Sequence, residues 1–310
     1  MFPIPKKEQP IYDFYLKHRS TFWSPEELNL TNERRDFEQL DEGVQHFLTY
    51  TLGFFASSDV LVGDNLKTNF MDEIKLCPTF GTFFGFQSSM EDIHSEVYSK
   101  LIDVLVASPK KKDHLFNAID TIPCIRRKAE WILQYMRRDV PFVKRLMAFA
   151  LFEGVAFASS FSSIFFVRQC HPGKLQGLVL SNELIARDES LHCDFSVYIY
   201  NDWIVNKLTD AEAHEIVESL LVVEREYVRS ALPTSLIGLS PDMMVKYVEF
   251  CADNLLERMG HKRLYGHTEC PLDFMKAINA MIKVNFFEAR SGNYALSDAH
   301  QDELEISESF

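Results

Sequence analysis

The clearest chemical pattern in the sequence is a pair of Glu-x-x-His motifs. They are Glu91-Asp-Ile-His94 and Glu189-Ser-Leu-His192. On a helix, residues three apart share a face, so each motif directs a carboxylate and an imidazole to the same point. One such motif carries little weight, because about one is expected by chance in a protein with 10 histidines. Two of them, on separate and otherwise apolar helices, indicate a shared site.

Two isolated acids extend this pattern. Glu153 is the only charge within the apolar stretch 147–167, and Asp59 lies on another mainly apolar helical face. Buried carboxylates are costly unless they are paired or bind a metal. Two such acids and two Glu-x-x-His motifs are the ligand inventory of a carboxylate-bridged di-metal site in a four-helix bundle. The predicted metal ligands are therefore Asp59, Glu91, His94, Glu153, Glu189 and His192.

Long helices must position these side chains. The helical period dominates from Asp41 onward, and the expected helices are 42–70, 81–107, 113–138, 142–170, 174–207, 210–230 and 241–260. The stretch 147–167 also has the length and hydropathy of a membrane span. No second such stretch accompanies it, so we favour a buried central helix and no membrane association. The expected fold is all-α, a bundle of long helices with the metal site in its core.

The two ends of the sequence differ from this helical domain. We expect an irregular lead-in over 1–40, in which Ser24 and Pro25 begin a helical turn. The helical domain would span 41–288. The polar, acidic tail 289–310 cannot bury enough apolar surface to fold alone.

Composition excludes some partners and favours one compartment. A net charge of −13 argues against nucleic-acid binding, which needs a basic face. The six cysteines form no C-x-x-C pair, which favours reduced thiols in the cytoplasm.

Four segments resemble a known family. They are SSD at 57–59, MEDIHSEVY at 90–98, FEG at 152–154 and NELIARDESLHCDF at 182–195. These segments resemble the small, radical-generating subunit of class I ribonucleotide reductase, of the eukaryotic or eukaryotic-virus type. The resemblance implies a ferritin-like bundle that holds two iron ions per subunit. One iron would be bound by Asp59, Glu91 and His94 and the other by Glu153, Glu189 and His192, with Glu91 and Glu189 bridging.

The resemblance also implies where the radical forms. Tyr98, one helical turn beyond His94, would be the radical tyrosine, in a dry pocket that includes Phe157, Phe161 and Ile185. The iron centre would use O₂ to oxidise this phenol to a neutral radical.

Three further residues would form the family's electron path. Asp188 would link Trp23 to His94, and Tyr294 in the tail would pass the radical to the large subunit. That subunit reduces ribonucleoside diphosphates to deoxyribonucleotides. The resemblance implies docking through the tail that ends at Phe310, and a homodimer of small subunits.

Other interpretations stay open on the sequence alone. The protein could be another ferritin-like di-metal oxidase, although such enzymes lack the Trp–Asp–His relay. It could also be an inactive small-subunit-like interaction protein, although no ligand is missing. Oxygen-rich ligation with two imidazoles suits iron or manganese, and Tyr98 favours two irons over a manganese/iron pair.

Overall fold

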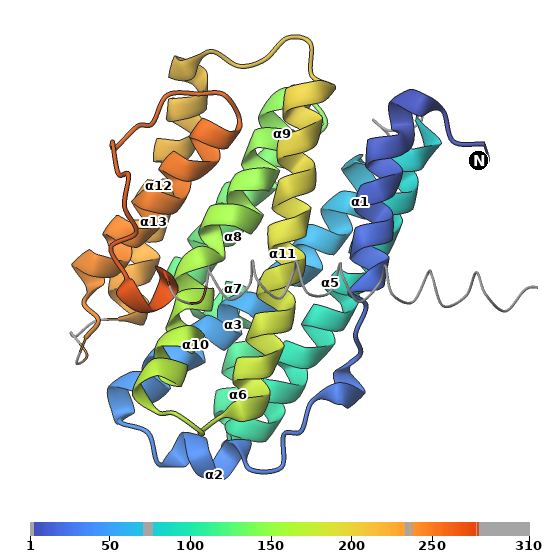
Figure 1. Ribbon diagram of the computed structural model, residues 1–310. Helices are drawn as coiled ribbons and strands as arrows, with labels where there is room; N and C mark the ends of the chain where they lie inside the picture. Colours follow the sequence, from blue (N-terminus) through green and yellow to red (C-terminus); the bar gives the residue numbers. More distant parts are fainter. Residues whose placement is uncertain (1–2, 71–76, 233–235, 237, 277, 279–310) are drawn as a thin grey trace, which may run out of the picture.

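The structure is a computed structural model that describes residues 3–70, 77–232, 236, 238–276 and 278 (Figure 1). The tail 289–310, with Tyr294 and Phe310, lies outside the described residues. Throughout the described ranges the regular structure is helical, apart from one isolated bridge between Leu236 and Leu239. The expected all-α fold is confirmed.

The long helices form the centre of the molecule. They are α3 (Glu42–Asn65), α5 (Pro78–Leu105), α9 (Phe142–Leu151), α10 (Ala158–Cys170) and α11 (Gln176–Asp202). Figure 1 shows them side by side, with α9 and α10 forming one continuous rod. Within this group α3 packs on α5, α10 packs on both α3 and α11, and α11 packs on α9.

The remaining elements pack around this centre. They are α1 (Gln9–Ser20), α2 (Glu33–Glu38), α6 (Pro109–Phe116), α7 (Ala118–Thr121), α8 (Pro123–Tyr135), α12 (Asp210–Ala231) and α13 (Pro241–Arg258). Single turns occur at η1 (Lys6–Glu8) and η2 (Pro25–Glu27), and a π-helical turn, η3 (Leu66–Phe70), follows α3. On one side α12 packs against α8, α9 and α13.

The apolar stretch is a core helix. The segment Phe142–Cys170 is the one candidate membrane span among the described residues, and 94% of its most apolar window is buried inside the protein. Between α9 and α10 it contains the π-helical turn η5 (Phe152–Ala156), where Phe157 N–H donates to the Phe152 carbonyl at 3.2 Å. Such turns are frequent at functional sites. This one carries Glu153.

The prediction of an irregular segment over 1–40 was wrong. Helix α1 begins with Pro10 in its first turn, where the missing N–H is not needed, and it buries Ile11 and His18. It packs against α5 and α11. Ser24 and Glu27 do form a capping box, but the helix that they begin is only the short turn η2.

The prediction of one helix over 113–138 was also wrong. The segment divides into the end of α6, then α7 and α8. Pro123 begins α8, and a proline restricts the preceding residue to extended backbone, as seen at Ile122 (φ −119°, ψ 105°). The break therefore has a local cause that the helical period concealed.

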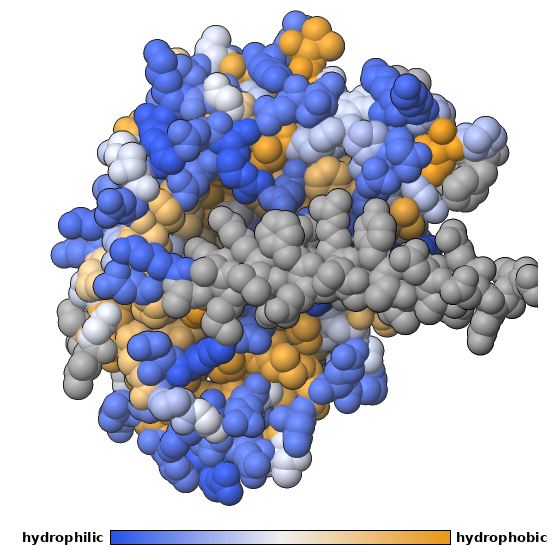
Figure 2. Space-filling view, in the orientation of Figure 1, coloured by the Kyte–Doolittle hydropathy of each residue, from blue (hydrophilic) through white to orange (hydrophobic). Residues whose placement is uncertain are grey.

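The surface is largely hydrophilic on the face shown in Figure 2. Figure 2 shows one face, where hydrophilic side chains surround smaller hydrophobic areas. Isolated exposed apolar side chains, such as Val205 and Val222, are usual on globular proteins.

Candidate metal centre

The six predicted ligands come from four elements at the centre of the bundle. Asp59 lies on α3, Glu91 and His94 on α5, Glu153 on η5, and Glu189 and His192 on α11. Each is at most 2% exposed. The helices bury apolar faces on one another, and these polar side chains interrupt those faces.

The two Glu-x-x-His motifs meet face to face. Glu91 places Oε2 3.4 Å from His94 Nδ1 and Oε1 3.1 Å from His192 Nδ1. Glu189 does the same, with Oε1 3.0 Å from His94 Nδ1 and Oε2 3.2 Å from His192 Nδ1. Each carboxylate thus divides its two oxygens between the two imidazoles. This is the arrangement that two bridging carboxylates between two metal ions would need.

Glu153 and Asp59 complete the group to different degrees. Glu153 Oε2 is 3.9 Å from His192 Nδ1. Together with Glu91, Glu189 and His192 it forms a cluster whose ligand atoms lie within 4.8 Å of one another. Asp59 falls outside that cluster but within the electrostatic influence of Glu91.

The unpartnered atoms of this group fit a metal centre. Buried polar atoms nearly always have a hydrogen-bond partner. Five ligand atoms here make no hydrogen bond of acceptable geometry, even where an opposite charge is close: Asp59 Oδ2, Glu91 Oε2, His94 Nδ1, Glu153 Oε2 and Glu189 Oε1. Carboxylate oxygens and imidazole nitrogens suit iron and manganese. The donor set therefore fits a di-metal site.

Electrostatics support the same conclusion. Burial raises the pKa of Asp59, and the charge of Glu91 adds to that rise. Burial likewise raises the pKa of Glu153, with further contributions from Glu189 and Glu91. Without cations these carboxyls resist ionisation, so two bound divalent ions would supply the missing counter-charge.

Gln87 is a residue of this site that the sequence did not single out. Its Nε2 donates to Glu153 Oε1 at 2.9 Å and, more distantly, to Glu91 Oε1 at 3.5 Å. The spacing could have revealed it, because Gln87 precedes Glu91 by one helical turn on the same face of α5. The amide links a ligand on η5 to a ligand on α5.

Comparison with known proteins decides the family. Residues 1–271 match the family described as ribonucleotide reductase, small chain. The protein belongs to this family. It is 44% identical over 294 residues to the ribonucleoside-diphosphate reductase small chain of Trypanosoma brucei brucei, an alignment that includes 95% of this protein and 86% of the relative. It is 42% identical over 294 residues to the ribonucleoside-diphosphate reductase small chain of Nicotiana tabacum, and this alignment includes 95% of this protein and 87% of the tobacco one.

A solved structure agrees with these relatives. The ribonucleotide reductase Rnr4 homodimer from Saccharomyces cerevisiae matches with a TM-score of 0.76 and 26% identity, over 91% of this protein and 89% of the yeast one. The ferritin-like fold is therefore confirmed. As a small chain, the protein is the radical-generating subunit of an oxidoreductase, ribonucleoside-diphosphate reductase.

In this small chain Trp23, Asp188 and His94 lie in contact. Trp23 Nε1 donates to Asp188 Oδ2 at 2.7 Å, and His94 Nε2 approaches the same oxygen at 3.3 Å. The Trp23 and His94 rings are nearly parallel, with centroids 6.1 Å apart. Although burial opposes it, the hydrogen bond from His94 lowers the pKa of Asp188, which favours the carboxylate. A hydrogen-bonded path thus joins α11, the segment before η2 and the metal centre.

Tyr98 of the small chain is fully buried on α5, and its hydroxyl has no hydrogen-bond partner. Burial raises the pKa of this phenol, and the charge of Asp59 raises it further. The Phe55 ring stacks on the Tyr98 ring at 4.5 Å and 6°. Phe55 also contacts Phe157 and Phe161, with centroids 5.5 and 4.8 Å away.

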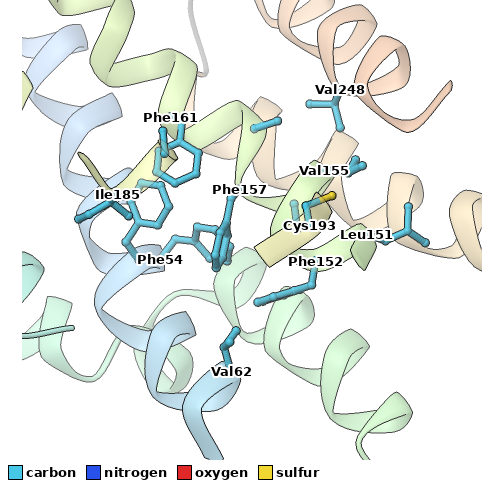
Figure 3. Close-up of a cluster of buried hydrophobic side chains, with 14 of the residues drawn as sticks. Phe54, Val62, Leu151, Phe152, Val155, Phe157, Phe161, Ile185, Cys193 and Val248 are labelled. Atoms are coloured by element: carbon cyan, nitrogen blue, oxygen red, sulfur yellow. The ribbon is translucent and has the colours of Figure 1, made fainter. Parts of the chain in front are cut away.

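The side chains of this aromatic pocket are apolar and buried. Figure 3 shows Phe157, Phe161 and Ile185 gathered with Phe54 between the helices. The sequence predicted the first three as neighbours of the tyrosine and missed Phe55. Phe55 lies on α3, one turn before Asp59, so its side of the helix was already identified as facing the site.

Proposed function

We propose that the six clustered side chains bind two iron ions per subunit. Asp59, Glu91 and His94 would hold one ion, and Glu153, Glu189 and His192 the other, with Glu91 and Glu189 bridging. The divided oxygens of Glu91 and Glu189 carry this proposal. Two irons bound there would use O₂ to remove one electron from the Tyr98 phenol. A manganese/iron pair is the second candidate.

We propose Tyr98 as the radical residue. Burial and the carboxylates around the phenol hold its proton in the resting state, since both raise its pKa. Oxidation must therefore remove a proton together with the electron. Asp59 is the carboxylate with the largest charge effect on the phenol, so it is our candidate for receiving that proton. The stack with Phe55 excludes water and donors that would quench a radical.

Trp23 and Asp188 are the proposed route for electrons. The indole N–H and the His94 N–H share one carboxylate oxygen, so a proton can shift along these contacts while an electron crosses between the nearly parallel rings. Asp188 would hold the indole ring of Trp23 in a fixed position relative to the imidazole of His94. Removing the carboxylate charge would weaken both contacts.

The partners are proposed from the family. The protein would form a homodimer and dock on a large catalytic subunit through the tail that ends at Phe310, with Tyr294 passing the radical. Neither nucleic acid nor a membrane is a proposed partner. The cytoplasm is the proposed compartment, and the six cysteines, all free thiols, support it.

Electron paramagnetic resonance tests the central proposal. Metal-free protein would receive Fe(II) and O₂, beside the Tyr98→Phe variant. We expect a tyrosyl doublet in the wild type only, with two irons bound in both proteins. Two irons without a radical would instead favour a di-metal oxidase, or an inactive interaction protein when O₂ is not consumed. Failure to take up metal would refute the whole site.

A further inference from the structure

A further buried histidine lies directly behind His192, one of the proposed ligands. His18, near the end of α1, is fully buried, and its Nε2 is 3.3 Å from His192 Nε2. The two rings meet edge to face, with centroids 4.8 Å apart. The rings of Phe83 and Phe86 on α5 enclose the His18 ring, with centroids 5.6 and 4.8 Å away. Aromatic packing therefore fixes its orientation.

The protonation pattern of this pair follows from geometry. His192 Nδ1 faces Glu91 and Glu189, so that nitrogen is the one available to a metal ion. A metal-bound imidazole carries its proton on the other nitrogen, here Nε2, which must find an acceptor. The atom at hydrogen-bond distance is His18 Nε2. His18 must then be unprotonated at Nε2 and carry its proton on Nδ1.

This arrangement carries a stability cost at His18. Its Nδ1 is buried and has no hydrogen-bond partner. An unpaired buried donor destabilises the fold, and an apolar side chain would fill the aromatic niche without that cost. The presence of a polar ring in this niche is explained by its one side-chain hydrogen-bonding contact, which is to His192.

We infer that His18 is a positioning residue that accepts the His192 Nε2 proton and so aims His192 Nδ1 at the second metal ion. The inference rests on the proposed di-metal site and concerns one of its two ions. The other imidazole, His94, has a carboxylate behind it, Asp188. The two ions would therefore be held by histidines with different acceptors, one neutral and one anionic.

Titration of the metal-free full-length protein with Mn(II) tests this inference. The electron paramagnetic resonance signal of free Mn(II) disappears as the ion binds, so its loss gives the number of bound ions and the affinity of each. Wild type should bind two ions. His18→Phe keeps an aromatic ring but removes the acceptor, and should weaken one ion by about 10–100-fold, the usual effect of losing a partner behind a metal ligand. His18→Gln presents an amide oxygen at a similar reach and should restore both ions.

A matched control is His261→Gln. His261 is also largely buried, but it bonds Tyr200 and Asp210 instead of a proposed ligand. This variant should bind two ions as the wild type does. Two ions bound with wild-type affinity by His18→Phe would overturn the inference, and so would equal weakening of both ions. If the wild type itself bound no Mn(II), the proposed site would fail instead.

A second measurement needs no variant. In wild-type protein loaded with Zn(II), long-range ¹H–¹⁵N spectra report which ring nitrogen carries the proton. We expect a protonated Nε2 on His192 and an unprotonated Nε2 on His18. A His18 ring protonated at Nε2 would contradict the inference, whatever the folding of the variants.

Discussion

A buried ion pair that contacts the π-helical turn η5 offers a sharp test of how the bundle holds its ligands. Lys128 on α8 and Glu224 on α12 are 0% and 1% exposed, and their charged atoms are 2.8 Å apart. Lys128 Nζ also donates to the Ala156 carbonyl at 2.8 Å, and it lies 3.5 Å from the centre of the Phe54 ring. Ala156 is the last residue of η5, the turn that carries Glu153. One ammonium group thus joins α8, α12 and the turn of a proposed ligand.

Removing Lys128 should be strongly destabilising. Lys128→Met leaves the Glu224 carboxylate buried, with only the Ser159 hydroxyl donating to it at 3.3 Å. Breaking a buried pair in this way costs about 3–5 kcal/mol. Adding Glu224→Leu removes the uncompensated charge. The double variant should then lose about 1–3 kcal/mol, the cost of a buried Ala156 carbonyl without its donor.

Urea unfolding of the metal-free protein, followed by circular dichroism, measures these losses. The control is Lys67→Met, because Lys67 pairs with Asp92 at the surface, where the two side chains are 49% and 69% exposed. That variant should lose less than about 1 kcal/mol. If Lys128→Met were as mild as the control, or the double variant as unstable as Lys128→Met, the buried pair would not hold these elements together.

The loss should also depend on pH with a definite sign. Burial raises the pKa of Glu224, and Lys128 opposes that rise. In Lys128→Met the pKa must therefore be higher still. A carboxyl with a raised pKa in the folded state stabilises that state at low pH and loses this contribution as the pH rises through the folded pKa. The deficit of Lys128→Met should be smaller near pH 5 than near pH 8.

Three further predictions concern the site itself. Burial raises the pKa of Asp59 and Glu153, so both carboxyls must lose protons when metal binds, and the metal-free fold loses their stabilising contribution as the pH rises. The increase in Tm on adding Mn(II), measured by differential scanning fluorimetry, should therefore be larger near pH 7.5 than near pH 5.5. An increase that does not change with pH would contradict this. A Cβ at Gly154 would lie 2.7 Å from Cys193 Sγ, so Gly154→Ala should lower the free energy of urea unfolding by about 1–3 kcal/mol. Adding Cys193→Ala to this variant should recover part of the lost stability. No recovery would mean that the clash lies elsewhere. Asp188→Asn should weaken one Mn(II) ion by about 10–100-fold with helical content unchanged, and unaltered Mn(II) titration would argue against its role behind His94.

The proposed ligands could be predicted because each is locally anomalous. Glu153 is a charge inside an apolar helix, and the Glu-x-x-His motifs repeat on separate helices, so the sequence itself contains the contradiction that a metal would resolve. Most helix positions could likewise be predicted, because the period of the apolar residues is itself visible in the sequence. The errors arose where that period was weak or misleading. Helix α1 is mainly polar and buries only Ile11 and His18, and Pro123 breaks a stretch across which the apolar pattern continues.

The supporting residues could not be predicted, because nothing about them is anomalous until the protein folds. His18 is distant in sequence from His192, and Lys128 sits in CIRRKAEW, which is typical of the solvated face of an ordinary helix. Their contacts depend on how α1 and α8 cross the bundle, and on the π-helical turn at η5, which no proline or glycine pair in FEGVA forces. A buried ligand is recognised by its own cost, whereas its hydrogen-bond partner is recognised only by position. For this reason the variants at His18 and Lys128 test the folded arrangement itself, whereas the effects of variants at the six ligands could be predicted from the sequence alone.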